Sequence, residues 1–370
     1  MNRIVLNAAD LDGYLTEVDK RNLQKLDESY KNAMHLFKLL TELDEGDEAV
    51  KLRNRLIALY DEMGDAMQAI TDNEPRVRVY SWETPTIAHG EVSRLIAKLR
   101  DVETGQHEFI YYIQRAYELL FNLAYGGTQK ERRNHLIVRT PITHPVQNFA
   151  VHKIPNIDRD IGNSVMCVML RGALLPSMIM SKEIQEYSSN GYLTPFALFK
   201  VSRNDEKSEK DMEYILDLDR SYFDLKDLDG RDLVFADPMN ATGGSLVTIV
   251  KYLYGQGVKP NSILFVNVIS AFKGALRIVR TIDTAVIYTL WMDPVLNSRA
   301  YILPGLGDAG DRINGEDRKD SQRDIIQLIA AYGSTITSLY RFQVSKIEEM
   351  VLRRRGANRR DAKRSAHNEI

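Results

Sequence analysis

Residues 234–245 read Val-Phe-Ala-Asp-Pro-Met-Asn-Ala-Thr-Gly-Gly-Ser, and they predict a buried strand, a tight turn and the first turn of a helix. The apolar run ends at Asp237, and the two adjacent glycines lack the Cβ atoms that would keep backbone amides from turning inward. Hydroxyl donors flank the glycines, and the start of the helix adds a partial positive charge. This combination predicts a phosphate-binding turn, with Asp237 placed to hold sugar hydroxyls.

A second stretch, residues 301–312, reads Tyr-Ile-Leu-Pro-Gly-Leu-Gly-Asp-Ala-Gly-Asp-Arg. Its glycines, proline and carboxylates rule out a helix or a plain strand, so we expect a loop that offers backbone donors and acceptors to a small ligand. Taken alone, residues 234–245 are also compatible with an ordinary strand-to-helix turn rich in small residues. They lack the lysine of the Gly-x-x-x-x-Gly-Lys-Ser/Thr loop that binds nucleoside triphosphates.

Together, the two stretches resemble those of a known enzyme family. An acid followed by Ala-Thr-Gly-Gly-Ser is similar to the phosphoribosyl pyrophosphate (PRPP) loop of type I phosphoribosyltransferases. Pro-Gly-Leu-Gly-Asp-Ala-Gly-Asp resembles a signature of the uracil phosphoribosyltransferase family, and the order and separation of the two also match. The resemblance covers about residues 89–316 and leaves 1–80 and 318–370 outside it. It implies an α/β fold with a mostly parallel sheet flanked by helices, here with added helical extensions at both ends.

The composition is that of a soluble globular protein, with 370 residues, 44% apolar residues and 27% charged residues. No apolar run approaches the roughly 20 residues that span a bilayer, and no secretory signal is apparent. The single cysteine, Cys167, excludes an intrachain disulfide, and we expect it in the core. These features favour a cytoplasmic protein without membrane contact.

The spacing of apolar residues divides the chain into five parts. Residues 1–72 show helical spacing on both sides of a break and predict an antiparallel helical hairpin for packing or self-association. Residues 73–90 contain two prolines and are interpreted as a linker to a catalytic unit at 91–317. Residues 318–352 predict a C-terminal helix, kinked at a glycine, that packs on the hairpin or on another subunit. Residues 353–370 form a basic tail that we expect to be disordered.

Strands and helices alternate in the central unit, as in α/β folds with a parallel sheet. The strand segments are apolar throughout, which suits a sheet buried on both faces, and phosphate loops belong at the carboxyl ends of such strands. We predict strands at 135–139, 164–170, 193–201, 214–218, 232–236, 261–269 and 284–291, and helices at 106–125, 174–186, 244–256 and 272–281.

The family resemblance also implies roles for individual residues. The arginine at 171 would meet the pyrophosphate with a fork that matches two phosphate oxygens, and the arginine at 203 would close over the same group from a mobile loop. Backbone groups near 302–309 would read the imide and carbonyls of uracil. The implied PRPP-binding residues are Arg171, Arg203, Asp237, Pro238, Met239, Asn240, Ala241, Thr242, Gly243, Gly244, Ser245 and Asp308. The implied uracil-binding residues are Ile302, Gly307, Asp308 and Ala309.

The reaction implied by the resemblance converts uracil and PRPP to uridine monophosphate (UMP) and pyrophosphate, a step of pyrimidine salvage. Its cofactor would be Mg²⁺, held through PRPP and water near Asp308 rather than by a dedicated set of protein ligands. Uracil and PRPP are therefore the expected small-molecule partners, and self-association is expected because family members are oligomers. A net charge of −2 disfavours nucleic-acid binding. The basic residues at 353–364 nevertheless keep such binding as an alternative.

Several positions depart from the family pattern. The usual Arg-Ala-Gly is Arg171-Gly172-Ala173, a glycine is replaced by Ala300, and a phenylalanine is replaced by Asn314. The mobile loop also lacks the family's proline and its Tyr-x-Lys-Leu end. A second hypothesis therefore stays open, in which the fold is retained as a nucleotide-binding sensor or scaffold without turnover or with altered base specificity.

Overall fold

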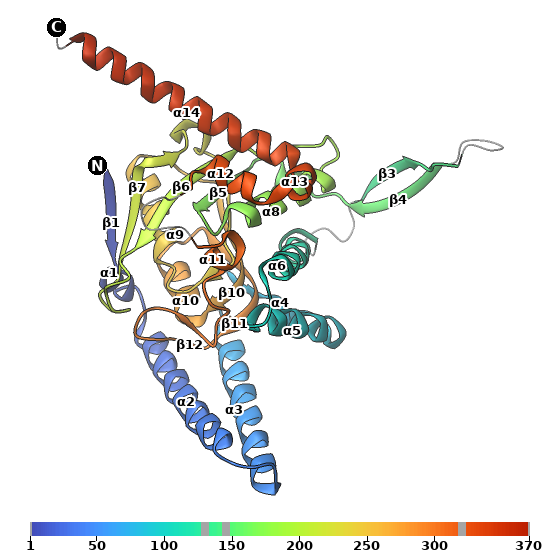
Figure 1. Cartoon of the computed structure of the whole chain (residues 1–370), viewed down its shortest axis with the longest axis vertical. Helices are drawn as coiled ribbons and strands as arrows, with labels where there is room; N and C mark the ends of the chain where they lie inside the picture. Colours follow the sequence, from blue (N-terminus) through green and yellow to red (C-terminus); the bar gives the residue numbers. More distant parts are fainter. Residues whose placement is uncertain (1, 127–132, 143–148, 317–322, 369–370) are drawn as a thin grey trace.

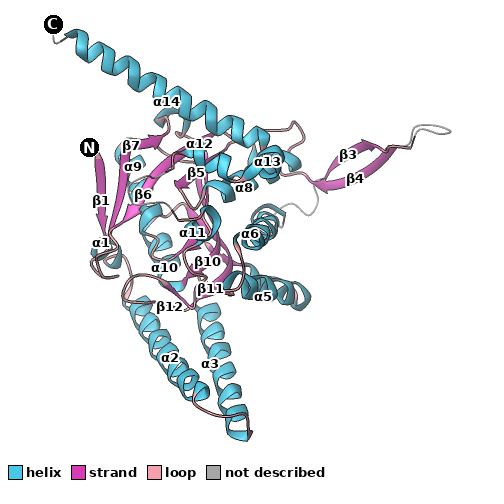
Figure 2. Cartoon of the chain, in the orientation of Figure 1, coloured by secondary structure: helices cyan, strands magenta, loops and turns pink. Residues whose placement is uncertain are grey.

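The computed structural model describes residues 2–126, 133–142, 149–316 and 323–368, with backbone alone beyond residue 357. A large sheet with helices on both faces forms its centre (Figures 1 and 2). The strand order is β1-β7-β6-β5-β8-β10-β11-β2, and the short β9 also pairs with β10. This is the α/β class expected from the sequence, with a mostly parallel sheet flanked by helices and extra helices at both ends.

Parallel pairing unites the middle of the sheet, and the antiparallel pairs lie at one edge. Strands β6, β5, β8, β10, β11 and β2 run parallel to one another, whereas β7 is antiparallel to both β6 and β1. The two central strands β5 and β8 are buried almost throughout, as parallel strands covered on both faces should be. The bounds are β1 Arg3–Asn7, β2 Val77–Val79, β5 Ser164–Leu170, β6 Phe196–Arg203, β7 Glu213–Tyr222, β8 Asp232–Ala236, β9 Met239–Asn240, β10 Ser262–Ala271 and β11 Ala285–Asp293.

Helices cover both faces because the crossovers run in two directions along the sheet. The crossover from β5 to β6 runs one way, and those from β8 to β10 and from β10 to β11 run the other way. Helices α9 and α10 contact each other on one face, and α6 and α8 contact each other on the other. Cys167 is buried in β5, as predicted. The bounds are α5 Thr86–Arg100, α6 Gln106–Phe121, α7 Asp158–Ile161, α8 Leu174–Tyr187, α9 Gly244–Gly255, α10 Phe272–Thr281 and α11 Ala309–Asn314, with a π-helical turn at Asn122–Gly126 and a short 3₁₀ turn at Leu225–Asp227.

The N-terminal part contains the expected helical hairpin, which extends from the body (Figure 1). Helix α2 spans Glu17–Thr41 and starts with a capping box at Thr16 and Asp19, and α3 spans Asp47–Thr71. The sequence did not reveal that β1 and the short α1, Ala8–Asp12, precede the hairpin. Strand β1 pairs with β7 in the main sheet, so the N-terminal part contributes to the sheet as well as to the hairpin.

The linker interpretation of residues 73–90 is wrong in this structure. These residues hold β2, the short α4 Tyr80–Glu83 and the start of α5, and β2 pairs with β11 at the edge of the sheet. The prolines separate these elements rather than preventing them, since Pro85 is the N-cap of α5. Alternating valines between the prolines were the local sign of the strand.

The C-terminal part is helical, but it does not pack on the N-terminal hairpin, which was one of the two predicted alternatives. Helices α12 Ile325–Ala331, α13 Gly333–Leu339 and α14 Arg341–Asn368 follow one another, with the predicted break at Gly333. Helix α14 contacts α8, β6 and β7 rather than the N-terminal hairpin. The predicted boundary at 317–318 lies outside the described residues.

Residues 353–368 continue α14 instead of forming a disordered tail. Arginine, lysine and alanine favour helix, and ion pairs hold the first of these residues. Arg353 pairs with Asp224 and Asp227, and Arg355 pairs with Asp324. The basic side chains further along, at 359–364, lie outside the described ones.

A two-stranded hairpin of β3 Arg133–Arg139 and β4 Phe149–Pro155 projects away from the body (Figure 1). The sequence predicted its first strand only. A second small pair, β12 Val295–Leu296 with β13 Ile302–Leu303, closes the loop after β11. Among the described residues, no helix is both long enough and apolar enough to cross a bilayer.

Candidate functional site

A cavity of about 440 Å³ lies at the carboxyl edge of the central strands. Its walls are the residues that follow β5, β6 and β8, together with the loop that contains the second sequence motif. All residues that the sequence placed in the two binding sets line this one cavity: Arg171, Arg203, Asp237, Pro238, Met239, Asn240, Ala241, Thr242, Gly243, Gly244, Ser245, Ile302, Gly307, Asp308 and Ala309.

The turn at 237–245 is fixed by hydrogen bonds to the neighbouring strand. The Asp237 amide donates to the Val266 carbonyl at 3.1 Å, and the Asn240 side chain donates to Ser270 Oγ at 2.8 Å. Helix α9 begins at Gly244, so amides of its first turn have no acceptor within the helix, and Gly244 and Ser245 line the cavity. Such a helix start is an arrangement that can accept an anion.

The two glycines of this turn are required by space as well as by conformation. Gly243 has a φ of +73°, and a Cβ there would lie 2.9 Å from the Gly274 carbonyl oxygen. At Gly244, a Cβ would lie 2.2 Å from an atom of the buried Tyr214 ring. Tyr214 of strand β7 and Gly274 of helix α10 therefore pack closely against the turn, and only glycine fits at positions 243 and 244.

Asp237 carries the main electrostatic feature of the cavity. Burial raises the pKa of its carboxyl to about 7, and the nearby Asp308 adds to the rise. A hydrogen bond from the Met239 amide to Asp237 Oδ1, at 3.0 Å, acts in the opposite direction on this pKa. The carboxyl therefore changes charge near neutral pH, and a bound cation or hydroxyl group would favour its ionised form.

Arg171 follows β5 and already has partners. Its Nη1 donates to the Gly315 carbonyl at 2.7 Å, and its Nη2 forms an ion pair with Asp311. The Asp311 carboxyl feels both burial and Asp308, which raise its pKa, and Arg171 opposes them. An anion that binds to the Arg171 guanidinium would therefore compete with Asp311.

Arg203 ends β6 and points toward the second motif. Its guanidinium lies 4.7 Å from the centre of the Tyr301 ring, and Nη1 donates to the Ala300 carbonyl at 3.4 Å. Asp205 accepts from its Nε at 2.7 Å. These contacts join the segment after β6 to the loop at 301–312 across one side of the cavity.

The loop at 301–312 is held from outside the cavity by two arginines. Arg312 donates to carbonyls at Leu306, Asp101 and Thr104 and lies over the Phe109 ring. Arg100 pairs with the buried Asp293 at 2.6 Å, and that carboxylate accepts from the Gly305 amide. The backbone around Gly307, which has a φ of +78°, is thereby set at the cavity wall.

Two of the departures from the family pattern have identifiable surroundings. Ala300 keeps a left-handed backbone, with a φ of +63°, which is the conformation that a glycine adopts most easily. Asn314 donates to the Gly310 carbonyl and accepts from the Tyr332 hydroxyl at 2.9 Å, and Tyr332 belongs to the C-terminal part. The replacement at 314 therefore coincides with a contact that the C-terminal helices supply.

Sequence reasoning missed several residues that line the cavity. Lys200 and Tyr214 lie on the strands β6 and β7, while Asp311 stands inside the quoted motif without an assigned role. Lys200 interrupts the apolar run of residues 196–201 in β6, which was the available sign. Within the described residues, no group of three or more histidine, cysteine, aspartate or glutamate side chains is arranged to hold a metal ion.

Comparison with known proteins matches the central unit. The family model for uracil phosphoribosyltransferase matches residues 86–315. The chain is 37% identical to uracil phosphoribosyltransferase of Finegoldia magna over 232 residues, which cover 61% of this chain and 95% of that one. It is 31% identical to the enzyme of the same name from Dictyoglomus thermophilum over 233 residues, which cover 62% and 97% of the two chains.

Solved structures include a protein of Aquifex aeolicus that is 24% identical, with a TM-score of 0.43. That match covers 61% of this chain and 95% of the other. The helical hairpin and the C-terminal helices lie outside the residues that the family model matches.

Proposed function

The chain belongs to the uracil phosphoribosyltransferase family, and we propose that it transfers a phosphoribosyl group from PRPP to uracil, giving UMP and pyrophosphate. Membership of this family supports phosphoribosyl transfer, and uracil as the accepting base is our proposal. The observation that supports it most strongly is that the two motif-bearing segments and Arg171 line one cavity. The reaction would serve pyrimidine salvage, and we expect it in the cytoplasm.

In the proposed reaction, uracil N1 bonds to the anomeric carbon of the ribose as the bond from that carbon to the pyrophosphate oxygen breaks, and the N1 proton is released. The chain's contribution is positioning and charge. The amides and hydroxyls of residues 241–245 would hold the 5′-phosphate, and Asp237 would accept hydrogen bonds from the ribose hydroxyls. Arg171 and Arg203 would draw the leaving pyrophosphate to the opposite side.

The base would lie against the loop at 301–312. Ile302, Gly307 and Ala309 can offer backbone carbonyl and amide groups, which suit an imide flanked by two carbonyls. Asp308 caps helix α11 through a hydrogen bond from the Asp311 amide, so its carboxylate has a fixed position between the base and sugar sides.

Mg²⁺ fits the donor set of this cavity. Asp237 and Asp308 are close enough for one charge to raise the pKa of the other, and a divalent cation would relieve that repulsion. Hard oxygen ligands are those that Mg²⁺ prefers, and it keeps several waters when it leans on phosphates. We propose that Asp237 and Asp308 face it through water, and that the ion neutralises pyrophosphate when bound.

The direct test is an assay of the purified full chain with labelled uracil, PRPP and Mg²⁺. We expect labelled UMP to form, with less than about a hundredth of that rate for cytosine or hypoxanthine, since a site that pairs with a base's hydrogen-bonding edge rejects other edges strongly. An Arg171→Met variant serves as a matched control, because it retains the aliphatic stem but loses the charge. Product from another base instead of uracil would support phosphoribosyl transfer but contradict uracil as the substrate.

A second candidate is a nucleotide-binding sensor without turnover. The contacts of Arg171 with Asp311 and Gly315 favour it, because the arginine must leave them to meet pyrophosphate. Calorimetry that detects UMP or PRPP binding, together with no product from any base, would support this candidate over the first.

We also propose self-association. The hairpin β3–β4 projects from the body and exposes apolar side chains such as Ile137, Phe149 and Val151. Sedimentation equilibrium of the wild-type chain and of a variant with these three side chains changed to serine would test it, with the expected outcome that the variant dissociates.

A further inference from the structure

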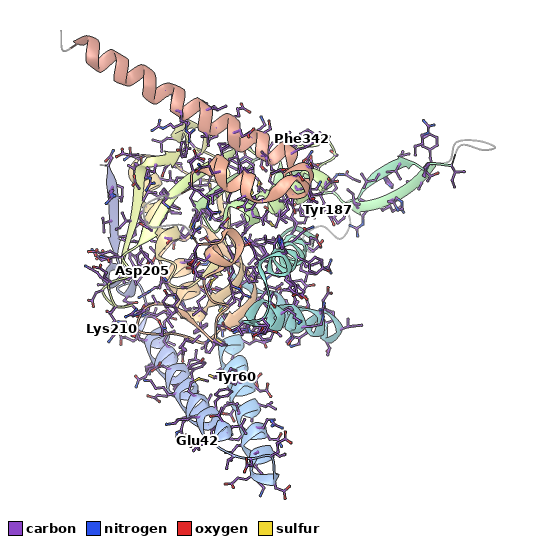
Figure 3. All side chains as sticks on the ribbon, in the orientation of Figure 1. Glu42, Tyr60, Tyr187, Asp205, Lys210 and Phe342 are labelled. Carbon is purple, nitrogen blue, oxygen red and sulfur yellow. The ribbon has the colours of Figure 1, made fainter. Side chains whose placement is uncertain are left out.

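A second cavity, of about 800 Å³, lies between the N-terminal hairpin and the central unit. It shares no lining residue with the site cavity. One wall comes from helix α3, where Tyr60 is labelled in Figure 3, and the other comes from α4, α5 and the end of β11. The α3 wall lies outside the region that the family model matches, so this cavity is a feature of the extended chain.

Aromatic rings dominate the wall of the second cavity that belongs to the central unit. Trp82, His89 and Trp291 all line it, and the His89 and Trp291 rings lie 5.8 Å apart at an angle of 40°. The Ser81 carbonyl lies 2.9 Å from His89 Nδ1. Because a carbonyl can only accept, Nδ1 carries a proton in this contact. The indole faces of Trp82 and Trp291 are of the kind that attracts cations.

The opposite wall brings negative charge. Asp61 and Asp65 stand one turn apart on α3 and line the cavity, and within the described part of the chain neither has an ion-pair partner. The third carboxylate of the lining, Asp293, is paired with Arg100, which is the lining's single guanidinium. The walls therefore carry a net charge of −2 with histidine neutral, which repels phosphates and nucleotides and attracts a cation.

The second cavity is also connected to the site cavity through a short chain of contacts. Arg100 donates both to Asp293 and to the Gly305 carbonyl, and Asp293 accepts from the Gly305 amide at 2.9 Å. Gly305 belongs to the loop at 301–312, two residues before Gly307 of the site cavity. A ligand that contacts Arg100 or Asp293 would therefore alter the hydrogen bonds that hold Gly305, and with it the loop proposed to bind uracil.

We propose that the second cavity binds a small organic cation with an aromatic or apolar body, and that its occupancy is coupled to the site cavity through Arg100, Asp293 and Gly305. The aromatic wall supplies the faces that the cation and its body contact, and Asp61 and Asp65 supply the charge. The binding half of this proposal is independent of the proposed transferase function, whereas the coupling half rests on it.

The chain itself provides the readout for binding. Trp82 and Trp291 are its two tryptophans, and both line this cavity, so intrinsic tryptophan fluorescence reports on it directly. We would titrate the full chain with benzyltrimethylammonium and compare it with benzyl alcohol and phenylacetate, which keep the ring but are neutral and anionic. A saturable signal is expected for the cation, with half-saturation at about tenfold lower concentration than for the alcohol.

Variants on α3 separate a bound cation from nonspecific quenching. The double change Asp61→Asn with Asp65→Asn should raise the half-saturating concentration of benzyltrimethylammonium by about tenfold, since it removes both unpaired charges. Glu62→Gln, between them on the same helix, is the matched control and should leave the titration unchanged, because Glu62 pairs with Arg55 instead of lining the cavity. A linear signal without saturation, or an unchanged double variant that retains the wild-type thermal unfolding temperature, would overturn the proposed site.

Coupling is measured by calorimetry of UMP binding with and without saturating benzyltrimethylammonium. A change in UMP affinity of at least about fivefold is expected in the wild type, which is the lower end of the usual range of coupling between sites. No change is expected in the double variant. Equal UMP affinity under both conditions would overturn the coupling. Failure of UMP to bind at all would contradict the proposed function instead, and the fluorescence titration would still decide the cation site.

Discussion

Two segments border the site cavity and are held in place by different forces. The turn at 237–245 is fixed by close packing around two glycines, with Tyr214 and Gly274 in van der Waals contact. The segment at 204–212, which joins β6 to β7, is fixed mainly by charge. Its Glu209 forms ion pairs with Arg277 at 2.8 Å and Lys273 at 3.0 Å, and Asp12 of α1 completes the cluster.

The two segments also differ in where their partners come from. The turn is supported by strands and helices of the central unit alone. The segment at 204–212, whose Asp205 and Lys210 are labelled in Figure 3, is also supported by the N-terminal part. The Ala8 amide donates to the Met212 carbonyl, and Asp12 of α1 shares Arg277 with Glu209. The difference teaches that the chain fixes the turn at 237–245 within the central unit, whereas it fixes the segment after Arg203 partly through an extension outside the family match.

The largest effect is expected where packing is tightest. A Cβ at Gly244 would lie 2.2–2.4 Å from the buried Tyr214 ring, so Gly244→Ala must displace either β7 or the turn. We expect the free energy of unfolding to fall by about 3 kcal/mol and the rate of UMP formation to fall at least about a hundredfold.

The matched control for Gly244→Ala is Gly255→Ala at the other end of α9, where a Cβ would meet open space. This change should stabilise the protein by about 0.5–1 kcal/mol, because alanine is the better helix former. Urea denaturation and steady-state kinetics of the two variants measure both effects. Similar behaviour of the two would mean that the turn is not held by packing.

The second effect tests the charged segment. Glu209→Gln leaves the fully buried Arg277 with Asp12 as its remaining carboxylate, so the free energy of unfolding should fall by about 2 kcal/mol. The KM for PRPP should rise several-fold while kcat changes less, since Arg203 lies at the start of this segment and would lose its fixed position. Thermal unfolding and initial-rate kinetics are the measurements.

Glu206→Gln is the control for the charged segment, because Glu206 is exposed and lies in the same loop. Its effect on unfolding should stay below about 0.5 kcal/mol. An equal effect of the two glutamate changes would contradict the claim that the buried ion pairs hold the segment.

The third effect concerns Asp237, a charged residue inside the turn at 237–245. Here charge acts within the segment that is otherwise held by packing. Burial raises the pKa of Asp237 from 3.8 to about 7, so between these pH values the unfolded chain has lost a proton that the folded chain retains. The free energy of unfolding contributed by this group therefore decreases as pH rises from about 4 to about 7 and is constant above that.

Asp237→Asn removes this pH dependence. At pH 8 the variant should be more stable than the wild type by about 2 kcal/mol. This is about half of the full free energy that corresponds to such a pKa shift, because the carboxyl opens onto the cavity. At pH 4 the free energies of unfolding of the two proteins should be alike. Chemical denaturation at both pH values measures the difference, with the exposed Asp283→Asn as control. The same stability difference at both pH values would contradict the raised pKa. The variant should nevertheless lose most of its transferase activity.

The sequence predicted the part of the fold that local patterns determine. The runs at 164–170 and 232–236 are apolar enough to be buried on both faces, and they became β5 and β8 without change at either end. The turn at 237–245 and the loop at 301–312 owe their shape to glycines in their own sequence. The structure therefore brings the predicted binding residues to one cavity, although their roles stay a proposal.

What the sequence could not predict depends on distant partners. Strand β1 exists because β7 offers it an edge, and three residues between two prolines become β2 because β11 is adjacent. Nothing local to Glu209 indicates that its partner is Arg277 on α10, nor does the motif containing Asp311 reveal its pairing with Arg171. Long-range charge pairing is set by the finished topology, which is why the loop at 204–212 was interpreted only as charged and loop-like.

The smallest effect lies at Ala300, where the segment at 204–212 meets the residues just before the loop at 301–312. Ala300 has a φ of +63°, its carbonyl accepts from Arg203, and its neighbour Ser298 accepts from the Glu209 amide. Ala300→Gly relieves a left-handed backbone that costs about 1–2 kcal/mol. It also removes a buried methyl group worth about 0.8 kcal/mol and adds entropy to the unfolded chain, so the two sides nearly cancel.

We therefore expect Ala300→Gly to change the free energy of unfolding by less than about 0.5 kcal/mol. Ala275→Gly in α10 removes an equally buried methyl group from a helical backbone with nothing to relieve, and it should cost about 2 kcal/mol. Differential scanning calorimetry of the two variants measures the contrast. A loss at Ala300 as large as that at Ala275 would mean that the left-handed residue is not strained, and that the family's glycine can be replaced here because the contacts with Arg203 and Glu209 already favour this backbone.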